Sequence, residues 1–304
     1  MAIVKPTLTV CITSLGANKT AYKKAQVNVK SLTRYFDVEL DQRILANDIF
    51  ESRSVQDRIN SLSLALGSGD VALAYSGGFN AVELLPEIAE LKSNLKSCFV
   101  GYSDNTILVN ALAKLGKCKT FYGPMYESYV TELVNKGQAA KQLSDLVNNT
   151  ATQFDIQGST VVKSGLMRGK IWGGNNYTFS LLQGTAFAPD FNEPFILFME
   201  GETILKSNTY VWRDFIRNID SIMLLPGSQQ NITGLVIGKF PAGFSVKKNE
   251  LEQFIEARSW LKNLPLVVDF PCGHTRRSLY LPIGQDLELS ALKNQTVKLT
   301  TYTV

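Results

Sequence analysis

The first half of the chain alternates short apolar runs with segments of helical periodicity, and this alternation limits the possible folds more than any other feature. Apolar runs at Leu8–Thr13, Val71–Tyr75 and Cys98–Tyr102 predict strands. Helices are predicted at Tyr22–Tyr35, Ser54–Leu66, Pro86–Leu91 and Asn105–Leu115. Strands that alternate with helices form parallel sheets covered by helices on both faces, and ligands bind at the carboxyl ends of such strands. The sequence therefore predicts an N-terminal α/β domain.

The second half follows a different pattern. Strands are predicted at Phe195–Met199, Thr233–Ile237, Leu264–Phe270 and Ser278–Leu281, and helices at Tyr210–Ile219 and Glu250–Leu261. A polar stretch at about 141–160, rich in Asn, Gln, Ser and Thr, separates the halves. We predict an N-terminal domain at 1–145, a linker at 146–165 and a C-terminal domain at 166–304. The sequence leaves open whether the polar stretch is a passive linker or a lid.

Composition excludes several classes of protein. With 304 residues, 45% hydrophobic and 19% charged, the chain is long enough for two globular domains. A net charge of +4 without a basic block gives no support for nucleic-acid binding. Four dispersed cysteines are typical of reduced thiols in a cytoplasmic protein, and no apolar run is long enough for a membrane span or a signal peptide. We expect a cytoplasmic protein.

The chain contains one histidine, His274, which follows a predicted strand in the segment Asp269-Phe270-Pro271-Cys272-Gly273-His274. Imidazole is the side chain best suited to accept and return a proton near neutral pH. The alternative is a surface or core histidine without a chemical role. A single histidine and dispersed cysteines cannot supply three convergent metal ligands, so we expect no metal.

Ser103 lies between a predicted strand and a predicted helix, where a sharp turn would expose its hydroxyl above the sheet. This is the arrangement of a nucleophile elbow, in which the N–H of the next residue, Asp104, points toward a developing oxyanion. Asn105 replaces the second glycine of the G-x-S-x-G pattern, so the segment is not a standard α/β-hydrolase signature. The alternative is that Ser103 is a helix N-cap.

Glycine pairs and carboxylates supply the remaining candidates. Gly77-Gly78 follows a predicted strand and would let backbone N–H groups approach a ligand, although an ordinary turn is the plainer interpretation. Gly173-Gly174 has the same two interpretations. Glu200 ends a predicted buried strand and is our choice for the acid that orients His274, with Glu202 as the alternative.

Several motifs, in this order along the chain, resemble those of the LD-carboxypeptidase family of serine peptidases. They are Gly101-Tyr102-Ser103-Asp104-Asn105-Thr106, Tyr122-Gly123-Pro124, Trp172-Gly173-Gly174-Asn175 with Leu181-Leu182-Gln183-Gly184-Thr185, Ile196-Leu197-Phe198-Met199-Glu200, and Gly273-His274-Thr275 with Leu281-Pro282-Ile283-Gly284. The likeness extends from Val55-Gln56-Asp57-Arg58 to the C-terminal strands. In the detail of Trp172-Gly173-Gly174-Asn175, the chain is more similar to the microcin C self-immunity branch than to the murein-recycling branch.

The resemblance implies a Ser-Glu-His triad of Ser103, Glu200 and His274, with the N–H groups of Gly78 and Asp104 as the oxyanion hole. It also implies an N-terminal parallel α/β domain, a C-terminal mostly β domain, an active site between them, a homodimer and no cofactor. Gly201 stands where the family usually has aspartate, and Ser76 where many members carry another polar or basic group. These departures leave substrate recognition open, and also leave open which glutamate faces His274.

Two substrates fit this interpretation: a muropeptide tetrapeptide ending in D-alanine, and a peptidyl or aminoacyl nucleotide similar to processed microcin C. Candidate substrate-binding residues are Gly77, Trp172, Asn175, Glu202 and Arg213. Trp172 would stack on a base, and an arginine such as Arg213, Arg276 or Arg277 would bind a free carboxylate, although each has a plainer surface role. The alternative from another class is a non-catalytic binding protein that keeps the cleft without turnover.

Overall fold

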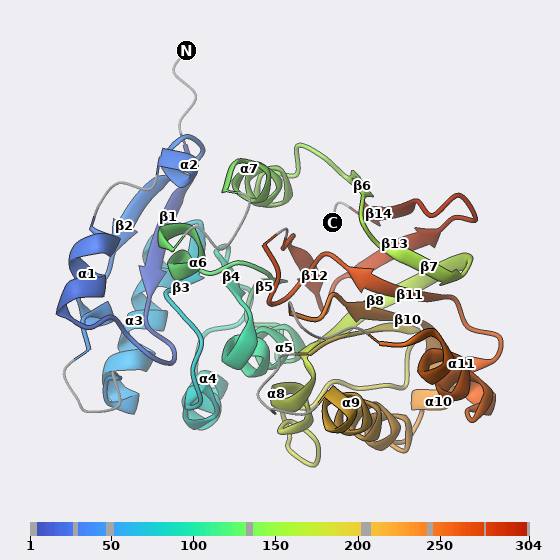
Figure 1. Ribbon diagram of the computed structural model, residues 1–304. Helices are drawn as coiled ribbons and strands as arrows, with labels where there is room; N and C mark the ends of the chain where they lie inside the picture. Colours follow the sequence, from blue (N-terminus) through green and yellow to red (C-terminus); the bar gives the residue numbers. More distant parts are fainter. Residues whose placement is uncertain are drawn as a thin grey trace. The chain divides into compact units, whose positions relative to one another are not determined.

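The computed structural model describes residues 5–26, 30–46, 52–131, 136–201, 208–241, 246–276 and 278–302 (Figure 1). The chain forms two compact units. The first comprises Met1–Ala151, Ala186–Ala188 and Arg276–Gly284, and the second comprises Thr152–Thr185, Pro189–Thr275 and Gln285–Val304. No helix in the described part of the chain is long and apolar enough to span a bilayer.

The first unit is built on a six-stranded sheet with the strand order β12-β5-β4-β3-β1-β2. Its strands are β1 (Thr7–Cys11), β2 (Asp37–Leu40), β3 (Val71–Ala74), β4 (Cys98–Gly101), β5 (Lys119–Tyr122) and β12 (Leu281–Ile283). All are parallel except β12, which pairs antiparallel with β5. The predicted parallel α/β domain is confirmed, and fully buried runs such as those of β3 and β4 are what a sheet covered on both faces requires.

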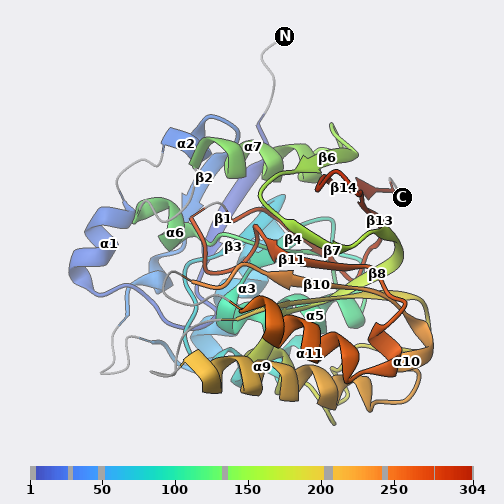
Figure 2. The same ribbon diagram turned by 45° about the vertical axis from the view of Figure 1, so that its right-hand side comes forward.

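Helices connect these strands, as Figures 1 and 2 show. They are α1 (Lys19–Ala25), α2 (Lys30–Thr33), α3 (Val55–Ser68), α4 (Leu85–Ala89), α5 (Thr106–Lys114), α6 (Tyr126–Val130) and α7 (Lys136–Val147), with 3₁₀ turns η1 (Gln42–Ile44), η2 (Ala81–Leu84) and η3 (Ser103–Asn105). The chain moves from β1 outward to β2 and then back past β1 to β3. In a parallel sheet whose strand order reverses in this way, ligands bind at the carboxyl ends of the strands on either side of the reversal, here β1 and β3.

The second unit is built on an eight-stranded sheet with the order β6-β14-β13-β8-β9-β10-β11-β7. Its strands are β6 (Gln153–Ile156), β7 (Thr160–Lys163), β8 (Gly165–Asn175), β9 (Phe195–Glu200), β10 (Ile232–Gly238), β11 (Leu266–Phe270), β13 (Asp286–Ala291) and β14 (Val297–Thr301). Its helices are α8 (Asn176–Ser180), α9 (Asn208–Met223), α10 (Ser228–Asn231) and α11 (Lys248–Glu256), with the 3₁₀ turn η4 (Ser259–Leu261). The expected mostly β second domain is confirmed.

Two kinds of strand form this second sheet. The central strands β8, β9, β10 and β11 are parallel, and every residue of β9 is buried. The outer strands are antiparallel, and β13 alternates buried with more exposed residues, as a strand with one solvated face does. The Gln295 side chain accepts a hydrogen bond from the Val161 N–H (2.8 Å) and donates one to its carbonyl (3.2 Å), and so joins the β13–β14 turn to the edge strand β7.

The structure corrects several predicted elements. Helix α1 begins at Lys19, because the Asn18 side chain accepts hydrogen bonds from Thr20 N–H and Ala21 N–H, and it ends at Ala25, well before the predicted end at Tyr35. The strand predicted at Ser278–Leu281 instead begins at Leu281. Gly173 and Gly174 lie inside β8, not in a turn, and α8 follows directly.

The domain boundary at 146–165 stays a prediction, but this stretch is not irregular. It contains the end of α7, the strand β6 and the strand β7. Both strands are paired in the second sheet, where β6 pairs with β14 and β7 with β11. Polar composition concealed them because both are edge strands with several exposed residues.

Candidate active site

Ser103 occupies a strained turn between β4 and α5. Its φ is 58°, in the left-handed region that a residue with a Cβ rarely adopts. The Thr106 hydroxyl donates a hydrogen bond to the Ser103 carbonyl (2.6 Å), and the Ser103 N–H donates to the Tyr122 hydroxyl (3.3 Å). Tyr102, not Ser103, is the N-cap of η3, and Asn105 is that of α5, so the N-cap alternative is wrong. A strained strand-to-helix turn is the backbone geometry of a nucleophile elbow.

Asn105 explains how the turn holds without the second glycine of the usual pattern. This fully buried side chain accepts a hydrogen bond from the Thr13 hydroxyl (2.5 Å) and donates one to the Ser76 carbonyl (3.0 Å). Its Cβ lies against Gly101, where an added Cβ would approach to 2.6 Å. The amide therefore fastens the Ser103 turn to the segments that follow β1 and β3.

The Gly77-Gly78 pair runs directly beside Ser103. A Cβ at Gly77 would lie 3.0 Å from Ser103 Cβ and 3.1 Å from its Oγ. Gly78 has a φ of 153°, and a Cβ there would overlap Ser14 Oγ and Leu15 Cγ. The absence of a side chain at Gly77 thus brings the backbone close to the candidate nucleophile, and the φ and surroundings of Gly78 favour glycine there.

The Asp104 side chain is committed to the fold. Its buried carboxylate accepts hydrogen bonds from the Ser14 hydroxyl (2.5 Å) and the Ala81 N–H (2.8 Å). Burial raises the pKa of Asp104 above its ordinary value, against these hydrogen bonds, which lower it. Only the backbone of Asp104 is therefore a candidate for contact with a substrate.

Glu200 and His274 are paired within the second unit. Glu200 ends β9 and is fully buried, and His274 follows β11. The His274 Nδ1 lies 2.9 Å from one carboxylate oxygen of Glu200 and 3.1 Å from the other. The His274 N–H also donates to Glu200 (3.3 Å). Because an ionised carboxylate only accepts hydrogen bonds, Nδ1 carries the proton in the neutral ring, and Nε2 is then the basic nitrogen.

Glycines allow this close packing around Glu200. Gly273 has a φ of 111°, and a Cβ there would lie 2.5 Å from Glu200 Oε2. A Cβ at Gly238 would lie 2.6 Å from Glu200 Cβ. The Gly273-His274 order in the sequence thus lets the histidine backbone approach a buried carboxylate.

Of the other candidates, Asn175 contacts this pair directly. Glu202 lies outside the described residues. Asn175 is buried, donates to Glu200 Oε1 (3.2 Å) and accepts from the Thr178 N–H (3.2 Å) as the N-cap of α8, so both ends of its amide are engaged within the protein. Trp172 is only 4% exposed, which leaves little ring surface for a base. Both side chains are buried, and their predicted contact with a substrate stays a prediction.

Two of the three arginine candidates, Arg213 and Arg276, are exposed. Arg213 is exposed on α9, where it lines a 230 Å³ groove together with residues of α11 such as Glu250 and Phe254. Arg276 belongs to the first unit and is exposed, and Arg277 lies outside the described residues. The predicted carboxylate-binding role of Arg213 thus has no support in its surroundings.

Sequence reasoning missed a set of polar residues that contact one another behind the Gly77-Gly78 loop: Ser14 and Arg58, which are buried, and Asn80, which is half-buried. Arg58 is 1% exposed although it lies in the first turns of a helix. Arg58 lies next to the apolar positions Ile59 and Leu62 of this helix. Arginine is rarely buried, so the apolar periodicity alone does not predict that Arg58 is.

All four cysteines are buried. Burial raises the pKa of the Cys118 thiol to about 12 and raises those of Cys11 and Cys98 as well. We therefore expect the native protein to react slowly with a disulfide reagent such as dithiobis(nitrobenzoate) at pH 8, and the denatured chain to release all four thiols at once. A thiol that reacts rapidly in the native protein would contradict this expectation.

Comparison with known proteins assigns both units. Residues 9–123 match the LD-carboxypeptidase N-terminal domain, and residues 168–289 match the LD-carboxypeptidase C-terminal domain. The microcin C7 self-immunity protein MccF of Escherichia coli is 26% identical over 289 residues, which cover 83% of this chain and 80% of MccF.

Solved structures agree in fold. An MccF-like protein from Bacillus anthracis superposes with a TM-score of 0.84 at 23% identity and covers 99% of this chain and 98% of its own. A structure of MccF in complex with glutamyl sulfamoyl guanosine has a TM-score of 0.79 at 20% identity, and the match covers 99% of this chain and 97% of the MccF chain. With both units matched by the family's own domains, this chain belongs to the LD-carboxypeptidase family.

Proposed function

We propose that this protein is a serine peptidase or amidohydrolase that acts through an acyl-enzyme, with Ser103, Glu200 and His274 as its triad. The observation that carries the proposal is the contact of the His274 Nδ1 with the fully buried Glu200 carboxylate at 2.9 Å. This contact fixes the ring and stabilises its cationic form, which is the task of the acid in a triad. The strained turn of Ser103 supports a nucleophile at that position.

The proposed reaction has two halves. His274 Nε2 takes the proton of Ser103 Oγ as this oxygen attacks the substrate carbonyl carbon, and the oxyanion accepts hydrogen bonds from the N–H groups of Gly78 and Asp104. The C–N bond then breaks as His274 gives the proton to the leaving amine. Water, deprotonated by His274, attacks the acyl carbon and releases the acid and Ser103. The acyl-enzyme is the species that an experiment can trap.

Asn175 has a supporting role in this proposal. Its Nδ2 donates to Glu200 Oε1, and the His274 ring and backbone N–H also contact this carboxylate. A carboxylate that accepts several hydrogen bonds is held in its ionised form and in one orientation. Asn175 would thus help to hold the acid, and its predicted contact with substrate stays a prediction.

Two substrate classes remain, and different relatives favour each. The family name favours a peptide that ends in a D-amino acid, and the MccF complex with glutamyl sulfamoyl guanosine favours an aminoacyl nucleotide. A cytoplasmic location and a homodimer stay predictions from the sequence.

The test measures turnover and acylation together. We would incubate the protein with a muropeptide tetrapeptide ending in D-alanine and, separately, with an aminoacyl sulfamoyl adenosine, and quantify the released amine by mass spectrometry. A fluorophosphonate would be added in parallel, followed by peptide mapping. We expect turnover of one substrate and a single label on the peptide that contains Ser103.

A label on another residue would contradict the assignment of Ser103. Absence of both turnover and label in the folded protein would favour the second candidate, a binding protein of the same family. Tight binding of either ligand by calorimetry without hydrolysis would identify that case.

A further inference from the structure

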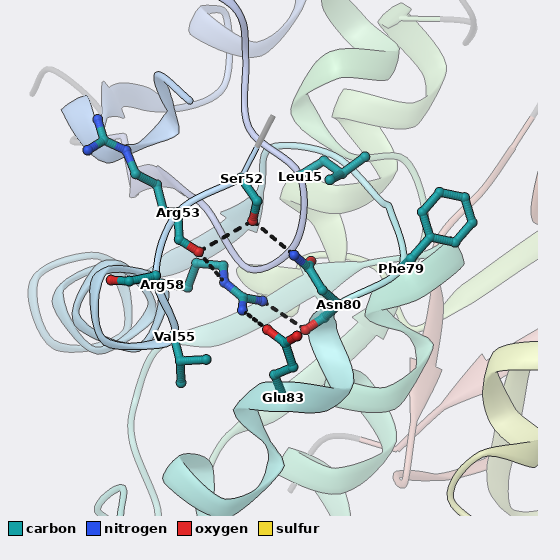
Figure 3. Close-up of a pocket in the computed structure, with 9 residues that line it drawn as sticks. Leu15, Ser52, Arg53, Val55, Arg58, Phe79, Asn80 and Glu83 are labelled. Carbon is teal, nitrogen blue, oxygen red and sulfur yellow. Dashed lines mark hydrogen bonds and ion pairs between the residues drawn. The ribbon is translucent and has the colours of Figure 1, made fainter. Parts of the chain in front are cut away.

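A buried arginine, Arg58, holds the loop that follows Gly77-Gly78. It lies in α3 and is 1% exposed. Its Nη1 donates to the Asn80 carbonyl (2.8 Å), its Nε to the Arg53 carbonyl (3.1 Å), and its Nη2 forms an ion pair with Glu83. Figure 3 shows these contacts converging from the helix and from the loop. The guanidinium therefore joins the start of α3 to the loop after β3.

The peptide unit between Asn80 and Ala81 is held at both ends. Arg58 binds its carbonyl oxygen, and the Asp104 carboxylate accepts a hydrogen bond from its N–H (2.8 Å). The Asn80 side chain adds two further contacts, since its Nδ2 donates to Ser52 Oγ (2.9 Å) and its Oδ1 lies 3.0 Å from Ser14 Oγ. Buried polar groups that are satisfied in this way hold one geometry, because any displacement leaves charges unpaired.

This peptide unit lies between the two proposed oxyanion donors. It follows Gly78 by two residues, and it is bound by the side chain of Asp104, whose own N–H is the other donor. The intervening residue, Phe79, is 82% exposed, so it contributes little packing that could hold the loop. Polar contacts hold the loop instead. Arg58, in α3, binds the Asn80 carbonyl and forms an ion pair with Glu83.

We propose that Arg58, supported by Glu83, is a positioning residue that holds the Gly78 N–H where the oxyanion forms. This inference rests on the proposed function. It assigns to Arg58 an effect on the transition state and none on substrate affinity, because the oxyanion exists only in the transition state.

A cavity makes the proposal testable by chemical rescue. Arg58, Asn80, Glu83 and Phe79 line a 520 Å³ space together with residues of the α3 start (Figure 3). If Arg58 is shortened to Ala, guanidinium added to the solution can enter this space and restore the contacts with the Asn80 carbonyl and Glu83. Guanidinium denatures proteins at molar concentrations. If Arg58→Ala lost activity only because it is less stable, guanidinium would not restore that activity, so rescue at tens of millimolar would indicate a positioning role.

The experiment measures kcat and KM of wild type, Arg58→Ala, Arg58→Lys and Glu83→Ala on whichever substrate is hydrolysed. We expect Arg58→Ala to lower kcat about 100-fold and Arg58→Lys about 10-fold, with KM changed less than about threefold, as for a misplaced oxyanion donor. Guanidinium, but not urea at the same concentration, should raise kcat of Arg58→Ala about 10-fold. Arg53→Lys is the matched control, because the Arg53 Nε donates to the Leu45 carbonyl, not to the loop, and its kcat should stay near wild type.

Unchanged kcat in Arg58→Lys and Glu83→Ala would overturn the proposal, as would a loss that appears only in thermal stability or only in KM. These two variants keep the test valid if Arg58→Ala does not fold, since Glu83 is half-exposed. If wild type hydrolyses neither substrate, the proposed function fails separately. The positioning role of Arg58 is then tested by hydrogen exchange of the Gly77–Ala81 amides. Equal exchange rates in wild type and Arg58→Lys would overturn it.

Discussion

Replacement of Ser103 by Ala is expected to lower kcat/KM about 10⁴- to 10⁶-fold on the hydrolysed substrate, as removal of the nucleophile does in other serine peptidases. Alanine retains the Cβ and therefore the same backbone strain at a φ of 58°, so the folded population should not change. The loss would come from chemistry alone, since no acyl-enzyme can form without Oγ. Residual turnover would reflect the oxyanion donors and binding.

The triad also predicts strong non-additivity. The double variant Ser103→Ala/His274→Ala should be about as slow as Ser103→Ala, because the histidine has no proton to accept once the hydroxyl is gone. Ser68→Ala is a suitable control, since the Ser68 hydroxyl is exposed and donates only to the Leu64 carbonyl of its own helix. Steady-state kinetics with thermal melts of each variant would measure this. Ser103→Ala that keeps more than about a tenth of wild-type kcat/KM would exclude Ser103 as the nucleophile.

Gly173→Ala is expected to destabilise the second unit by about 3–5 kcal/mol, the range of severe core substitutions. Gly173 has a φ of 133° inside β8, and a Cβ there would overlap the carbonyl oxygen of Phe198, its partner in β9. Neither strand can move without breaking the pairing that ends at Asn175 and Glu200. Loss of stability should therefore be accompanied by loss of activity.

Tryptophan fluorescence during urea unfolding reports this change selectively, because Trp172, Trp212 and Trp260 all belong to the second unit. Gly184→Ala separates backbone strain from collision: Gly184 has a φ of 78°, with open space where a Cβ would lie. We expect Gly184→Ala to cost only about 1 kcal/mol. Equal unfolding midpoints for Gly173→Ala and wild type would contradict this expectation. They would show that β8 and β9 can move apart to admit a Cβ without loss of stability.

The sequence alone determined the parallel sheet of the first unit and the position of Ser103. Strands such as Val71–Ala74 and Cys98–Gly101 are continuous apolar runs bounded by polar loops. Such a run can be recognised from residues that are adjacent in the sequence, because all of them are buried. The order of motifs likewise identified the family. Local signals failed for β6 and β7, which are short polar edge strands paired with segments far along the chain.

Only the tertiary structure decided which side chains meet. It placed the Asn175 amide on Glu200, buried Trp172, and brought β12 to the edge of the first sheet beside β5. It also showed that Arg58, a residue of an ordinary-looking helix, is buried against the Asn80 carbonyl. The physical reason is that periodicity along a chain records which face of an element is apolar, whereas a hydrogen bond between residues more than twenty positions apart depends on how separate elements pack.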